Sequence, residues 1–158
     1  MSDEATTKVT DLMDGIRIAM LTTTDGQGRL VSRPMATQDV ELGGDLWFIT
    51  ERSSSAAAQV AAHPGVNVSF SGSSSWVSLA GDARVVDDAD KLAELWDTFT
   101  GAWMEGGPDN PENVLIQVSA DTAEYWDSPG SRVTQVVNLV KAKVTGERFE
   151  GDNEVVDL

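Results

Sequence analysis

Apolar and polar residues alternate along most of the first half of the chain, a pattern typical of strands that bury one face. Short runs of glycine, aspartate and serine separate these segments and predict tight turns between neighbouring strands. The expected strands are Ile18–Thr24, Arg29–Gln38, Leu46–Thr50, Val66–Phe70, Trp76–Val86, Val114–Ser119 and Ala123–Trp126.

Apolar residues spaced three or four positions apart predict helices near both ends of the chain and at one crossover. A first helix is expected over Thr7–Gly15, and an alanine-rich helix lies in the stretch Phe48–Pro64. A third begins at Asp87-Asp88, and its single apolar stripe consists of Leu92, Leu95, Trp96, Phe99 and Trp103. The last expected helix has the apolar face Val133, Val136, Val137, Val140 and Val144.

Hairpin-linked strands and few helices predict a mainly β fold, because a parallel sheet would require strands and helices to alternate strictly. We expect a six-stranded antiparallel split β-barrel with peripheral helices. Residues 1–146 would form a single domain. Residues 147–158 would form an acidic C-terminal tail, frayed from Gly146 onward.

Composition excludes several classes of function. With 11 Lys+Arg against 26 Asp+Glu the formal charge is −15, which disfavours nucleic acid and anionic membrane surfaces as partners. The chain has no apolar run long enough to span a membrane, and its N-terminus does not resemble a secretion signal. It has no cysteine, so disulfides and thiolate chemistry are absent. We therefore expect a cytoplasmic protein.

Few residues are available for acid–base or metal catalysis. His63 is the only histidine, and its position before Pro64 at a helix end favours a capping role. No dinucleotide-binding fingerprint, phosphate-binding Walker loop or nucleophile elbow is present. No metal site and no catalytic side chain are predicted. If the protein is an enzyme, a bound cofactor supplies the reactivity.

The serine-rich turn before the alanine-rich helix allows two interpretations. Ser53, Ser54 and Ser55 can simply cap the helix, whose first amides lack acceptors within the helix. The same hydroxyls and amides can hold a phosphate. Arg52 is the one fully charged basic residue between the turn and the helix end. The residues of the turn do not decide between these interpretations.

Five segments, taken in order, resemble the pyridoxamine 5′-phosphate oxidase-like flavoproteins, and within them the general stress protein 26 branch. They are SRPMATQDV (32–40), LWFITERSSSAAAQVAAHPGVNVSF (46–70), WVSLAGDARVVDD (76–88), ELWDTFTGAWMEGGPDNPENVLIQV (94–118) and AEYWDSPGSRV (123–133). The resemblance implies a split-barrel homodimer with flavin mononucleotide (FMN) in two clefts between the subunits. It also implies an FMN-dependent oxidoreductase that acts on a small-molecule redox partner.

The resemblance also implies the cofactor-binding residues. One segment would lie along the flavin. A second would line the edge of the flavin ring, and the turn after it would bind the phosphate. Two further residues would close the site from the partner subunit. In chain order these residues are Arg33, Met35, Thr37, Phe48, Ile49, Thr50, Ser53, Ser54, Ser55, Trp126 and Arg132.

At several positions where family members have a basic residue or a histidine, this chain has a residue without charge. Ser55 and Ala56 replace a basic pair that follows the turn in the oxidases, and Thr134 and Val136 replace a substrate-side histidine and a cofactor arginine. Oxidation of pyridoxamine phosphate is therefore not expected, and weaker binding of a phosphate group is expected. The alternatives are a non-catalytic flavin-binding or sensing stress protein, or a dimer that binds a deazaflavin (coenzyme F420) or no cofactor.

Overall fold

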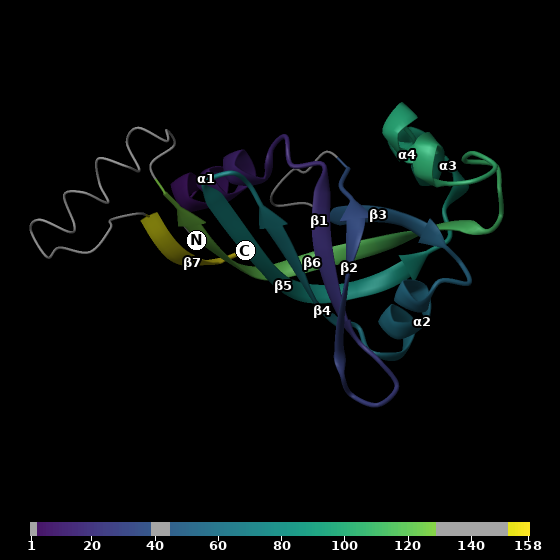
Figure 1. Ribbon diagram of the computed structural model, residues 1–158, viewed down its shortest axis with the longest axis horizontal. Helices are drawn as coiled ribbons and strands as arrows, with labels where there is room; N and C mark the ends of the chain where they lie inside the picture. The colour runs from purple at the N-terminus through teal and green to yellow at the C-terminus, as the bar shows by residue number, and fades with distance from the viewer. Residues whose placement is uncertain (1–2, 39–44, 129–151) are drawn as a thin grey trace, which may run out of the picture.

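The computed structural model describes residues 3–38, 45–128 and 152–158 (Figure 1). Its helices and strands follow the order α1 (Asp3–Met13), β1 (Ile18–Thr24), β2 (Leu30–Ala36), β3 (Leu46–Glu51), α2 (Ser55–Ala62), β4 (Gly65–Ser71), β5 (Ser75–Val86), α3 (Ala89–Leu95), α4 (Thr98–Trp103), β6 (Asn113–Asp127) and β7 (Asp152–Asp157). Strands therefore dominate, as the alternating pattern predicts.

All strands of the described residues belong to one antiparallel sheet. Along its main path the neighbours are β2-β1-β4-β5-β6-β3, and β7 pairs with β6 outside this path. The long strand β6 carries β3 beside residues 113–118 and β7 beside residues 122–127. On its other side β6 pairs with β5 between residues 115 and 127, so β6 connects both ends of the molecule.

The two end strands of the path, β2 and β3, come close to each other without pairing, so the sheet is curled but not closed. Helices lie around it: α1 contacts β5 and β6, α2 contacts β1, β3 and β5, and α3 contacts β6 (Figure 1). The expected mainly β architecture with peripheral helices is confirmed. The described part has seven strands where six were expected.

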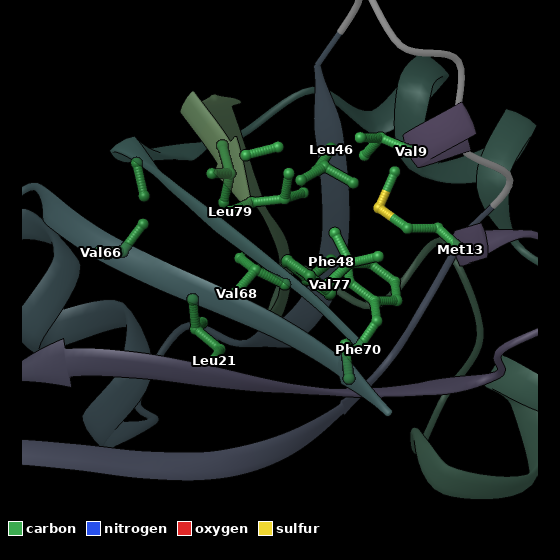
Figure 2. Packing of buried hydrophobic residues seen from close by; sticks show 14 of the residues in the cluster. Val9, Met13, Leu21, Leu46, Phe48, Val66, Val68, Phe70, Val77 and Leu79 are labelled. Carbon is green, nitrogen blue, oxygen red and sulfur yellow. The ribbon is translucent and has the colours of Figure 1, made fainter. Parts of the chain in front are cut away.

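The core lies on the inner face of this curled sheet (Figure 2). Register places Ala19, Phe70, Val77 and Tyr125 in one row across β1, β4, β5 and β6, and all four are buried. The amphipathic helix α1 covers one end of the core with the buried residues Val9 and Met13. Burial of one such aliphatic or aromatic side chain stabilises the fold by about 1.5–3 kcal/mol.

The third predicted helix is wrong as a single element. The chain forms α3 and α4, separated at Trp96 and Asp97. The side chain of Asp97 accepts a hydrogen bond from the Thr100 amide at 2.7 Å and so caps a new helix. An aspartate that caps a helix competes locally with continuation of the helix before it.

The C-terminal half of the chain gives two further corrections. Val114–Ser119 and Ala123–Trp126 are parts of the single strand β6, and the register with β5 shifts where a break was predicted. Asp152–Asp157, expected within a frayed tail, forms β7 against β6. The predicted helix over 133–144 lies outside the described residues, and the division at residue 146 stays a prediction.

The shift between β5 and β6 requires a glycine. Opposite Gly81 the register passes from Thr122 to Ala120, so β6 has one extra residue there. A Cβ atom added to Gly81 would lie 2.1 Å from the backbone oxygen of Ser119. No side chain fits at that separation, and the two strands approach this closely only because residue 81 is glycine.

A search of the described residues finds no helix that has both the length and the apolar character needed to cross a membrane.

Candidate cofactor site

An apolar pocket of about 310 Å³ opens where β2 and β3 approach each other without pairing. Its walls come from β2, β3 and α4, with single residues from β1 and from the start of α2. The lining residues are Ile18, Pro34, Met35, Ala36, Gln38, Ile49, Thr50, Glu51, Ser54, Thr100, Trp103 and Met104. The split in the sheet therefore forms a cavity of the size in which small ligands bind.

The strand walls of the pocket are held rigidly by the core. Met35 packs against the main hydrophobic cluster. On β3, Ile49 and Thr50 are both buried, Ile49 within a second cluster with Leu92 and Leu115. Consecutive buried residues on one strand indicate that both of its faces are covered. These walls consequently present a fixed, mostly apolar surface.

The helical wall is attached by polar contacts. The Gln38 amide group lies within a long hydrogen-bond distance, 3.4 Å, of the Thr100 hydroxyl, linking the end of β2 to α4. The loop after α4 is held by Asn113, whose side chain donates to the backbone oxygens of Glu105 and Gly107 at 3.0 and 2.9 Å. Trp103 on α4 is 71% exposed and still lines the pocket.

The polar end of the site is the first turn of α2. Ser54 is the N-cap, and its hydroxyl accepts from the Ala57 amide at 3.1 Å and from the Thr50 hydroxyl at 3.0 Å. The amides of Ser55 and Ala56 have no acceptor within the described part of the chain. The capping interpretation of the serine turn is therefore confirmed for Ser54. Two amides of the turn are left for an external acceptor, as anion binding requires.

Arg33 is a half-buried cation without a carboxylate partner in the described ranges. Its guanidinium donates to the Thr23 hydroxyl at 2.7 Å and to the side-chain oxygen of Gln59 at 2.9 Å. Both acceptors are neutral. Burial lowers the pKa of the Arg33 guanidinium from its usual value. Arginine side chains are effectively always protonated in proteins, so the charge persists.

The contact with Gln59 brings Arg33 toward the start of α2. Gln59 lies one helical turn after Ser55, and residues four apart share a helix face. The cation is therefore on the side of α2 that carries Ser55. Arg33 has no carboxylate partner among the described residues, even though carboxylates outnumber cations more than twofold in this chain of net charge −15. The arrangement is suited to an anionic group.

Arg52, the cation that directly precedes the serine turn in sequence, is engaged elsewhere. Its guanidinium forms an ion pair with Asp87 at 2.7 Å and donates to the backbone oxygen of Pro111 at 3.0 Å. These contacts tie the turn to the loop before β6. Arg52 therefore has its counter-charge within the protein, whereas Arg33 does not.

The remaining predicted site residues lie in different places. Phe48 is buried in the core, and Ser53 is exposed in the turn. Thr37 donates its hydroxyl hydrogen to the Ile16 backbone oxygen at 2.6 Å and is not among the residues that line this pocket. Trp126 is 40% exposed on the outer face of β6. Arg132 lies outside the described residues.

Several residues of the site were not singled out from the sequence. Gln59, which orients Arg33, is an isolated glutamine in an alanine-rich helix, and its position one turn after Ser55 was the available signal. Glu51 lines the pocket at the end of β3. Pro34 and Ala36, which belong to the segment expected along the flavin, also line the pocket.

Together these features can bind a ligand with a flat apolar portion and an anionic tail. The pocket accommodates a ring system, and Arg33 with the amides of Ser55 and Ala56 supplies donors for a phosphate. Met35, Ile49, Thr50 and Ser54, four of the predicted residues, line the same cavity. The chemistry of the donors therefore fits a flavin nucleotide.

Comparisons with known proteins identify the family of this chain. Residues 4–150 match the family described as pyridoxamine 5′-phosphate oxidase like. Protein bli-3 of Neurospora crassa is 30% identical over an alignment of 157 positions. The alignment covers 92% of this chain and 75% of that protein.

Solved structures include two related stress proteins. A general stress protein 26 from Jannaschia sp. CCS1 is 27% identical with a TM-score of 0.80, covering 99% of this chain and 100% of the other. A general stress FMN/FAD binding protein from Xanthomonas citri is 28% identical with a TM-score of 0.70, covering 82% and 93%. The match over 4–150 shows that this chain belongs to the pyridoxamine 5′-phosphate oxidase-like family.

Proposed function

We propose that the protein binds FMN, with the isoalloxazine ring in the pocket between β2, β3 and α4 and the phosphate at the start of α2. The observation that carries this proposal is Arg33, a half-buried cation oriented by neutral acceptors beside unsatisfied helix amides. The FMN/FAD binding relative from Xanthomonas citri supports it.

Each part of the chain has a separate task in this proposal. Met35 and Ile49 supply apolar surface for the ring, and the Thr50 hydroxyl lies at the junction between ring and tail. Arg33 and the Ser55 and Ala56 amides neutralise the phosphate locally, against the long-range repulsion of an acidic protein. A bound flavin supplies hydride and electron transfer, so no side chain needs to act as the redox centre.

We further propose a homodimer that forms on the outer face of the sheet. In the row Met20, Ser69, Ser78 and Glu124, each residue is the register partner of the next, and by alternation this face also carries Ile18, Trp76 and Trp126. The exposed fractions of Ile18, Trp76 and Trp126 are 42%, 44% and 40%. Large apolar side chains gathered on a sheet face indicate an interaction surface.

The outer face is continuous with the pocket, because Ile18 belongs to both. A second copy on this face would cover the open side of the pocket, and Trp126 of that copy would close it as the family resemblance implies. We propose a flavin-dependent oxidoreductase with two such sites, acting on a small-molecule redox partner. Binding without turnover, as in a flavin-sensing stress protein, is the second outcome of the test below.

The test is a calorimetric titration of purified protein with FMN and, in parallel, with a deazaflavin, after removal and identification of any bound chromophore. We expect FMN to bind with one site per chain and to give a flavin absorbance spectrum. Absence of heat with FMN would contradict the proposal. Binding of the deazaflavin alone would show that the cofactor is a deazaflavin and not FMN. If FMN binds but no electron donor reduces it, the proposal of FMN binding holds and the proposed oxidoreductase role is wrong.

A further inference from the structure

The charge of the pocket restricts which compound can react with a flavin held there; this argument rests on the proposed function. Of the described residues that line the pocket, Glu51 alone carries an ionisable side chain. Glu51 forms no ion pair with any cation of the described ranges. The lining therefore contains one negative charge and no positive one. Arg33 lies outside this lining, where it contacts Gln59 of α2.

The helical wall supplies an aromatic surface. Trp103 lines the cavity from α4, next to Met104, while most of its indole remains accessible. The wall is fixed by the Asp97 cap and by the contact between Gln38 and Thr100. An indole at the rim of an apolar cavity favours flat rings, because aromatic rings in contact attract each other beyond the effect of burial alone.

We propose that the second substrate is a planar aromatic or quinonoid compound without negative charge, and that Trp103 and Glu51 determine this specificity. Trp103 contacts the ring of the substrate. Glu51 disfavours carboxylates, sulfonates and phosphates, an effect that the net charge of −15 reinforces at long range. A phosphorylated pyridine is thereby excluded as the substrate.

The test measures equilibrium binding to FMN-loaded protein without turnover. The probes are menadione, a neutral naphthoquinone, and a naphthoquinone sulfonate with the same ring system. We expect menadione to bind about 2- to 5-fold more tightly, because the Glu51 carboxylate is exposed and solvent screens its repulsion of the sulfonate. Equal affinities, or tighter binding of the sulfonate, would overturn the inference.

Variants assign the two roles. Trp103→Ala should weaken menadione binding about 2- to 10-fold, and Trp103→Phe should restore most of it, as expected for ring contact. Glu51→Gln should tighten binding of the sulfonate and leave menadione unchanged. Leu30→Ala, at an exposed position that does not line the pocket, is the control and should change neither affinity. Unchanged menadione binding in Trp103→Ala would show that Trp103 does not contact the ring of the substrate.

The two proposals fail in distinguishable ways. If FMN does not bind, the proposed function fails, and the inference about a flavin substrate fails with it. If FMN binds and the sulfonate is favoured, only the inference is overturned. A sulfonate preference that disappears in Arg132→Ala would assign the anion contact to Arg132 and would likewise overturn the inference.

Discussion

The guanidinium of Arg33 donates to the side-chain oxygen of Gln59 across 2.9 Å and joins the edge strand β2 to helix α2. The same oxygen accepts the Thr23 hydroxyl at 2.6 Å, so three side chains from β1, β2 and α2 form one network. A neutral network around a cation fixes its position without cancelling its charge. This property distinguishes Arg33 from Arg52, which is paired with Asp87.

The contrast between these arginines predicts different effects on FMN binding. Arg33→Gln should weaken FMN binding about 10- to 100-fold, because a hydrogen bond to a charged group contributes about 1.5–3 kcal/mol. Arg52→Gln removes the same charge from a nearby segment whose cation is already paired, and should change the affinity less than about threefold. Calorimetric titration of both variants measures the difference. Equal losses would show that general charge, and not the position of Arg33, matters.

The outer face of the sheet predicts the oligomeric state. Trp76 and Trp126 are register partners on neighbouring strands, so a glutamate at either position places charge within the proposed interface. We expect sedimentation to show a dimer for the natural chain and a monomer for Trp126→Glu, with weaker FMN binding in the monomer. Ala93→Glu, at an exposed position on α3 and off the sheet, is the control and should remain dimeric. A natural chain that sediments as a monomer at micromolar concentration would contradict the shared site.

Gly81 predicts a large loss of stability on a minimal substitution. In Gly81→Ala the new Cβ would meet the Ser119 backbone oxygen at 2.1 Å, so β5 and β6 must separate at the register shift. We expect a decrease of about 2–3 kcal/mol or more in the free energy of unfolding. Gly65→Ala, with no atom within 4 Å of the added Cβ, should change stability by about 1 kcal/mol or less. Similar values for both variants in denaturant titrations would argue against the close approach.

The β1–β2 hairpin predicts a pH dependence through Asp25. Its carboxylate accepts from the Arg29 and Gln27 amides, each at 2.9 Å, and from the Arg29 guanidinium at 2.8 Å. The Arg29 amide, then the Gln27 amide and the guanidinium, lower the pKa of Asp25 against an opposing effect of burial. A lowered folded pKa means that the stabilisation is present above the ordinary aspartate value of about 4 and is lost as pH falls through the folded value.

Asp25→Asn should therefore be less thermostable than the natural chain at neutral pH. The difference in Tm should shrink as pH is lowered from about 5 toward 2, where the natural carboxylate becomes protonated. Because all other carboxylates titrate in both proteins, the difference between the two Tm profiles reports Asp25 alone. A difference that stays constant over this range would show that the charge of Asp25 does not contribute.

The sequence predicted most strands well because their alternation reflects a single buried face. Ile18–Thr24 has the predicted bounds, and Trp76–Val86 differs from β5 by one residue. Where the prediction failed, one signal in the sequence was outweighed by another. Asp97 caps α4 and divides an apolar stripe that is continuous in sequence. The polar residues near 121 mark a register shift inside β6, not its end.

The candidate site was predictable in part, through resemblance more than through pattern. The resemblance indicated Met35, Ile49, Thr50 and Ser54, which the fold brings to one pocket although they lie on different elements. The network of Arg33, Thr23 and Gln59 depends on strand register and helix packing, because its members are 10 and 26 residues from Arg33. No short motif encodes such a network.

A comparison of FMN with riboflavin on the natural chain tests the central claim most directly, because the ligands differ only in the phosphate. If Arg33 and the first turn of α2 receive that group, FMN should bind about 10- to 100-fold more tightly than riboflavin in the same calorimetric titration. Indistinguishable affinities would mean that no anion is held at this end of the cleft, and the proposed placement of the cofactor would be wrong.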